Sequence, residues 1–179
     1  MLKNSFALIA LMFTLAACVS DTGRSTAERR FLSLRHPASG EQVAATYVMN
    51  YRYDDAALGR FSELLRDRSA DATYAVDPKL LDFIGDLRDR VGLPETATFD
   101  ITSGYRSPAT NARLATGNRQ VARESWHMKG QAVDLRVPHL TGKAMAEVAK
   151  TMQRGGVAFY PKSGHVHIDT GPVRTWQVR

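Results

Sequence analysis

The sequence has almost no cysteine: among its 179 residues the only one is Cys18. A single thiol cannot form a disulfide within the chain, so a cross-linked scaffold is excluded. The chain has no internal repeat, no low-complexity segment, and no long Lys/Arg run with interleaved aromatic residues, which disfavours nucleic acid as a partner. The apolar run at residues 6–15 is too short to cross a bilayer comfortably.

The composition is that of one globular domain. Hydrophobic residues make up 44% and charged residues 23% of the chain, which suits a sizeable core and excludes a disordered protein. The net charge of +6 favours an acidic partner. Nucleic acid is disfavoured for the reason given above, so anionic lipid and an acidic wall polymer are the remaining classes.

The N-terminus has the features of an export signal. Lys3 precedes the apolar run, and the run ends in the small residues before Cys18. The segment Leu15-Ala16-Ala17-Cys18 resembles a bacterial lipobox, which implies a signal peptide at residues 1–17, a lipidated Cys18, and a polar tether over residues 18–30. Val19 after the cysteine favours the outer membrane over the inner one. The alternative is a plain signal peptide with an incidental cysteine.

The rest of the chain predicts an α+β domain with a small, mostly antiparallel sheet flanked by helices. Alternating apolar residues predict a hairpin over residues 31–54, and helical spacing with capping residues predicts the helices. The expected helices are 54–69, 77–92, 107–116 and 141–156, and the further strands are 99–104, 131–138, 156–161 and 165–169.

Five titratable residues carry the chemistry. His165, His167 and Asp169 alternate in HVHID, so on a strand they share one face, where unpaired burial would be costly. With His127 and Asp134 they offer nitrogen and oxygen ligands. Two imidazoles, a carboxylate and a water suit Zn²⁺, although non-haem iron also uses such a set. A solvated strand face is the competing interpretation of HVHID alone. The remaining histidines, His36 and His139, adjoin prolines and are expected at the surface.

Several motifs together carry a resemblance to a known family. The pattern S-x-H-x-x-G-x-A-x-D in SWHMKGQAVDL (residues 125–135), followed by H-x-H at 165–167, resembles the zinc D-alanyl-D-alanine peptidase superfamily. The segments SGYRSPATN (103–111) and VHIDTGPVRTW (166–176) are similar to its murein endopeptidase K branch. The resemblance covers residues 31–176 and implies the fold of that superfamily, shared with hedgehog proteins.

The resemblance implies a role for individual residues. His127, Asp134 and His167 match zinc ligands. Arg106 matches an arginine that binds substrate and stabilises negative charge. A guanidinium group suits this task because it stays protonated and can donate two parallel hydrogen bonds. His165 matches the first histidine of H-x-H, which contacts the reacting group.

Three further positions qualify this assignment. Asp169 is expected to accept a hydrogen bond from a ligand imidazole, or else to be an ordinary carboxylate at a strand end. Ser125 is expected to organise the chain around the site. Some members place a general-base glutamate three residues before the last ligand, where this chain has Gly164, so His165 is the best candidate for the base.

The implied function is a zinc-dependent murein endopeptidase that hydrolyses peptidoglycan cross-links with a metal-activated water, without an acyl-enzyme. The alternatives are a D,D- or L,D-carboxypeptidase acting on stem peptides, and a peptidoglycan-binding lipoprotein without turnover. We expect residues 31–179 to form the peptidase domain, as a monomer held by Cys18 on the periplasmic side of the envelope.

Overall fold

The computed structural model describes residues 25–118 and 121–178. The predicted signal peptide, Cys18 and the first part of the predicted tether lie outside the described residues, so the structure does not test them. Within the described ranges, no helix has both the length and the apolar character needed to cross a membrane.

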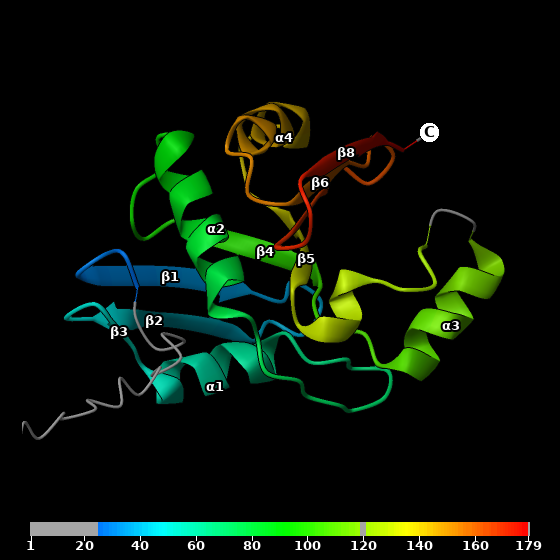
Figure 1. The fold of residues 1–179 in the computed structure, drawn as a ribbon, viewed down its shortest axis with the longest axis horizontal. Helices are drawn as coiled ribbons and strands as arrows, with labels where there is room; N and C mark the ends of the chain where they lie inside the picture. The colour runs from blue at the N-terminus through cyan, green and yellow to red at the C-terminus, as the bar shows by residue number, and fades with distance from the viewer. Residues whose placement is uncertain (1–24, 119–120, 179) are drawn as a thin grey trace, which may run out of the picture.

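One mixed sheet organises the domain (Figure 1). Its strands are β1 (Arg29–Arg35), β2 (Gln42–Met49), β3 (Arg52–Tyr53), β4 (Thr98–Ser103), β5 (Ala132–Arg136), β6 (Gly156–Phe159), β7 (Val166–Asp169) and β8 (Arg174–Gln177). Across the sheet they follow the order β3-β2-β1-β4-β5-β7-β6-β8. Strand β1 pairs with β4 in parallel, as does β6 with β8, and the other pairs are antiparallel.

The α+β class is therefore confirmed, but the sheet in the described residues is larger than expected and is mixed rather than antiparallel alone. The sheet has eight strands, and two of its pairings are parallel. The parallel pair β1/β4 arises because helices lie between these strands in the chain and allow a crossover. The parallel pair β6/β8 arises because the chain leaves the antiparallel β6–β7 hairpin and returns beside β6 as strand β8. The sequence patterns did not predict strand β8.

Side-chain caps explain where most helices begin. Asp54 caps α1 (Asp55–Leu64), Thr141 caps α4 (Gly142–Thr151), and Asp77 with Pro78 opens α2 (Pro78–Arg90). The helix predicted over residues 54–69 was too long at its end. Asp67 accepts hydrogen bonds from the backbone N–H groups of Ser69 and Ala70, which favours a turn over another helical turn.

The core and the polar side chains occupy opposite faces of strands β5 and β7. Val133, Leu135, Val166 and Ile168 join the buried apolar cluster together with Met145 of α4. Because strand side chains alternate, the residues between them face the other way. Helix α3 (Pro108–Gly117) stands apart from the main body at one end of the molecule (Figure 1).

Candidate metal centre

Two adjacent strands present the first two predicted ligands. In the antiparallel pairing of β5 with β7, Asp134 lies opposite His167. Both side chains are buried, with 5% and 6% exposure. Register and alternation therefore place a carboxylate beside an imidazole on the face away from the core.

The third predicted ligand comes from a short 3₁₀ helix, Trp126–Lys129, which Ser125 caps. The helix ends at Gly130 with φ of +64°, and a Cβ there would collide with the carbonyl oxygen of Ala75. Glycine thus supplies both the left-handed turn and the close approach. His127 Nδ1 lies 2.7 Å from the carbonyl oxygen of Gly104, to which it donates, so Nε2 faces the strands.

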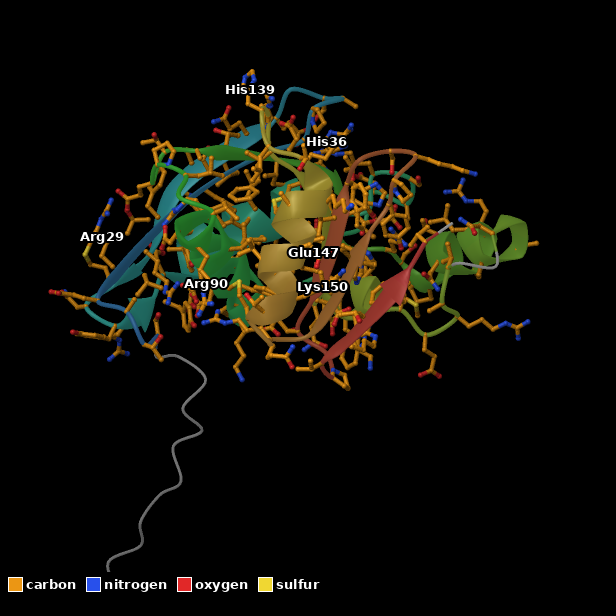
Figure 2. The ribbon with its side chains drawn as sticks, turned by 90° about the horizontal axis from the view of Figure 1, so that it is seen from above. Arg29, His36, Arg90, His139, Glu147 and Lys150 are labelled. Carbon is orange, nitrogen blue, oxygen red and sulfur yellow. The ribbon has the colours of Figure 1, made fainter. Side chains whose placement is uncertain are left out.

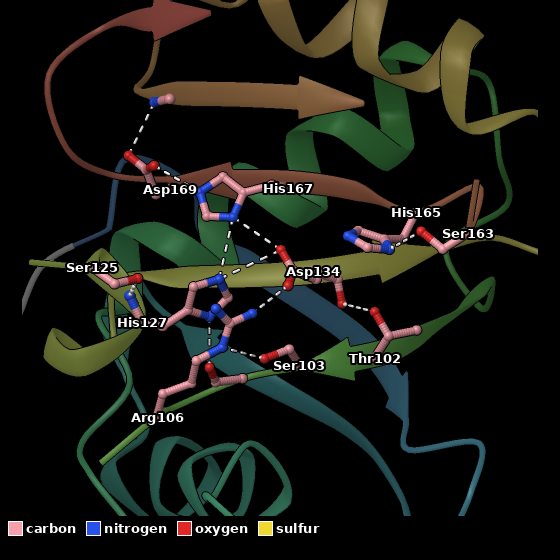
Figure 3. Close-up of polar contacts among 12 residues, drawn as sticks. Thr102, Ser103, Arg106, Ser125, His127, Asp134, Ser163, His165, His167 and Asp169 are labelled. Carbon is pink, nitrogen blue, oxygen red and sulfur yellow. Dashed lines mark hydrogen bonds and ion pairs between the residues drawn. The ribbon is translucent and has the colours of Figure 1, made fainter. Parts of the chain in front are cut away.

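The ligand atoms form a compact triangle (Figure 3). His127 Nε2 is 3.2 Å from His167 Nδ1 and 3.4 Å from Asp134 Oδ1, and His167 Nδ1 is 2.9 Å from the same oxygen. Atoms bound to a tetrahedral zinc ion at about 2.0–2.1 Å lie roughly 3.3 Å apart. The donor set and its spacing therefore fit a divalent ion, and His127, Asp134 and His167 are a possible metal-binding triad.

Asp169 adjoins this triad from behind. Its Oδ2 lies 2.9 Å from His167 Nε2 and accepts that N–H, which leaves Nδ1 facing Asp134 (Figure 3). The carboxylate is completely buried. A carboxylate that holds the outer nitrogen of a ligand histidine fixes both its tautomer and its orientation.

Arg106 lies on the other side of Asp134. Its Nη2 is 2.7 Å from Asp134 Oδ2, and its Nε donates to Ser103 Oγ at 2.9 Å. The backbone N–H of Arg106 donates to the carbonyl oxygen of His127 at 3.2 Å, so the arginine turn and the 3₁₀ helix are joined. The third guanidinium nitrogen, Nη1, makes neither the Asp134 nor the Ser103 contact, and Arg106 lines the cavity described below.

His165 lies one residue before strand β7. The strand begins at Val166, so His167 and Asp169 share one of its faces, while the carbonyl oxygen of His165 accepts a hydrogen bond from the N–H of Tyr160. Its Nδ1 is 2.7 Å from Ser163 Oγ, and its ring stacks on Tyr160 with centroids 4.2 Å apart. Within the described residues, its buried Nε2 has no hydrogen-bond partner. Figure 3 shows this nitrogen on the side of the ring that faces Asp134.

The charges of the triad are coupled. Burial opposes ionisation of Asp134, but the nearby imidazoles outweigh it and hold the pKa of that carboxyl well below its usual range. Burial lowers the pKa of His127. Burial also disfavours the charged form of His167, yet hydrogen bonds to Asp134 and Asp169 raise its pKa overall.

A cavity of about 330 Å³ opens beside the triad. Sequence reasoning missed several residues that line it, although three of them, Arg174, Thr175 and Trp176, lie in the quoted motif VHIDTGPVRTW. The lining includes Arg106, His127 and His167 together with Trp126, Tyr160, Arg174 and Trp176. The described lining residues do not include His165. Asn111 of α3 holds part of the cavity lining in place: its side-chain amide donates to the carbonyl oxygens of Ala122, which lines the cavity, and Arg123.

The remaining histidines lie outside the centre. Figure 2 labels both residues: His139 is exposed at the edge of the molecule, whereas His36, which was expected at the surface, is half-buried. His36 Nδ1 contacts the hydroxyl group and the backbone N–H of Ser39. Neither ring approaches the triad.

Comparisons with known proteins agree with the motifs. A family model described as peptidoglycan L,D-endopeptidase MepK matches residues 24–176. The chain is 33% identical over 153 residues to the probable peptidoglycan L,D-endopeptidase MepK of Haemophilus influenzae, an alignment that covers 86% of this chain and 82% of that protein. It is 37% identical over 155 residues to the peptidoglycan L,D-endopeptidase MepK of Escherichia coli K12, with coverage of 85% and 82%.

No solved structure matches significantly. The sequence comparisons nevertheless confirm the branch that the motifs predicted. With a family model that spans most of the chain and relatives aligned over most of their own length, the chain belongs to the peptidoglycan L,D-endopeptidase MepK family.

Proposed function

We propose that the protein is a zinc-dependent peptidoglycan endopeptidase that hydrolyses L,D peptide cross-links. The observation that carries the proposal is the buried triangle of His127, Asp134 and His167 beside a cavity lined by Arg106. The names of the relatives support the substrate and the bond type. We also propose the D-alanyl-D-alanine peptidase fold shared with hedgehog proteins, which the family membership supports.

The residues divide the catalytic work. His127 Nε2, His167 Nδ1 and Asp134 Oδ1 would hold the ion, which when bound polarises a carbonyl and lowers the pKa of a water. Arg106 would orient the substrate through Nη1 and stabilise negative charge that develops on the scissile carbonyl oxygen. Asp134 keeps the guanidinium in place through its second carboxylate oxygen.

His165 would move the proton to the leaving amine. Two observations support this: Nε2 faces the triad and has no hydrogen-bond partner among the residues that the structure describes, and the Ser163 contact orients the ring. Gly164 explains why the glutamate of some relatives is missing. Its φ is +74°, and its N–H closes a turn onto the carbonyl oxygen of Tyr160, a conformation that favours glycine over glutamate.

The His165→Gln variant is expected to bind the metal normally and to hydrolyse cross-links about 100-fold more slowly, because it lacks a titratable proton carrier. Turnover with bound metal content measured in parallel checks this. The matched control is His139→Gln, at an exposed histidine. Full activity in His165→Gln would remove this residue from the mechanism.

Incubating the protein with purified sacculi tests the function as a whole. We expect L,D-cross-linked muropeptide dimers to become monomers, a chelator to stop the reaction, and added Zn²⁺ to restore it. Release of only the terminal residue would instead identify a carboxypeptidase. An unchanged muropeptide profile with Zn²⁺ bound would contradict both enzyme hypotheses and favour a protein that binds peptidoglycan without hydrolysing it.

We further propose that Cys18 anchors the protein in a membrane, on the periplasmic side and in the outer membrane rather than the inner. The lipobox-like segment supports this. Partitioning of the full chain into detergent, lost in Cys18→Ala, is the measurement that tests it. The protein is proposed to act as a monomer on peptidoglycan stems.

A further inference from the structure

Strand β8 reaches the metal centre although another strand lies between them. In the order β7-β6-β8, Ala158 of the middle strand pairs with His167 on one side and with Trp176 on the other. Gly156, two residues earlier on the same face, pairs with Arg174. Because glycine and alanine leave this face of β6 nearly bare, side chains of the outer strands can meet across it.

Two contacts cross the bare strand. Over Gly156, Arg174 Nη1 lies 3.0 Å from Asp169 Oδ1, and Nη2 lies 2.7 Å from Oδ2. A Cβ on Gly156 would collide with both groups. Over Ala158, the rings of Trp176 and His167 lie 5.1 Å apart at 60°. The Arg174 guanidinium also lies over the Trp176 ring at 5.0 Å, so both contacts form one unit.

These contacts fix the orientation of the Asp169 carboxylate, because both of its oxygens accept hydrogen bonds. Its Oδ1 accepts from the backbone N–H groups of Gly156 and Gly171 and from Arg174 Nη1. Its Oδ2 accepts from Arg174 Nη2 and His167 Nε2. The forked pair sets the plane of the carboxylate, and that plane aims Oδ2 at the imidazole.

We infer that Arg174 is a positioning residue for the metal centre: its bidentate contact with Asp169 orients His167 so that Nδ1 is presented to the ion. A lysine would keep the charge but not the planar fork, so charge alone does not suffice. The inference rests on the proposed metal site. It competes with a direct role in substrate binding, since Arg174 is 38% exposed at its side chain and lines the cavity.

The test is the dissociation constant of Zn²⁺ for the full chain, measured by competition with a chromophoric chelator. Arg174→Lys is expected to weaken binding by about 10-fold or more, as loss of an outer contact to a ligand does. Arg35→Lys is the matched control, because Arg35 also contacts an aspartate, Asp100, through two nitrogens at similar exposure but far from the triad. It should bind Zn²⁺ like the wild type.

A double variant shows whether Arg174 acts through Asp169. Asp169→Asn alone should weaken Zn²⁺ binding, and adding Arg174→Lys should weaken it little further, because the contact is already lost. Melting curves establish that each variant is folded. Arg174→Met, which keeps the aliphatic stem on Trp176, replaces Arg174→Lys if the lysine variant unfolds.

The outcomes are separable. Wild-type affinity in Arg174→Lys, with only a raised KM for cross-linked muropeptides, would overturn positioning and make Arg174 a substrate ligand. Additive losses in the double variant would also overturn action through Asp169. A wild-type chain that binds no Zn²⁺ would overturn both this inference and the proposed metal site.

Discussion

The His127→Ala variant is expected to lose bound Zn²⁺ and peptidoglycan hydrolysis together. His127 is one of three protein ligands in the triangle, and it comes from a different segment than the paired strands. Two ligands cannot hold a catalytic ion as three do. Several kcal/mol of transition-state stabilisation would disappear, so turnover should fall by at least about 1,000-fold.

Metal content by atomic absorption and muropeptide release from sacculi check this expectation. His139→Ala is the matched control, because that histidine is exposed and lies at the edge of the molecule. Full zinc stoichiometry in His127→Ala would show that the ligand assignment is wrong. Burial of His127 at 2% exposure means that the melting temperature must be measured as well, so that unfolding is not mistaken for ligand loss.

The Arg106→Ala variant is expected to separate metal binding from catalysis. It should retain Zn²⁺ because Arg106 supplies none of the ligand atoms, yet turnover should fall by about 100- to 1,000-fold, the usual effect of removing a group that stabilises an oxyanion. The contact with Asp134 Oδ2 would also be lost, but Oδ1 still faces both imidazoles.

Steady-state kinetics on a defined cross-linked muropeptide, with zinc content determined on the same sample, measure both effects. Arg113→Ala is the control, an exposed arginine on helix α3. If Arg106→Ala turned over normally, the arginine would have no part in the reaction. If it lost zinc, its contact with Asp134 would be needed for the metal site itself, and charge stabilisation would no longer be the simplest account.

Local chemistry made much of the fold predictable. The caps at Asp54, Asp77 and Thr141 satisfy backbone N–H groups within their own turns, so the starts of three helices follow from short segments. The β6–β7 hairpin follows from two apolar runs and the turn between them. Parallel pairing was not predictable in this way, because it depends on where a crossover returns the chain.

The candidate site was also predictable only in part. The motifs named the three residues of the triad, and the expected alternation of HVHID correctly placed His167 and Asp169 on one face. For His165 the alternation stays a prediction, because the strand begins one residue later, at Val166, and the ring of His165 contacts Ser163 and Tyr160 of the β6–β7 connection. A period of two holds only while the chain remains extended.

The sequence by itself determined the ligand types, their spacing along the chain, and the helix starts, because these depend on neighbouring residues. Only the tertiary structure decided that Asp134 faces both imidazoles and Arg106, and which nitrogen of each histidine points inward. It alone brought Arg174 over Gly156 to Asp169. Such contacts follow from strand order and register, which are set by packing of the whole sheet.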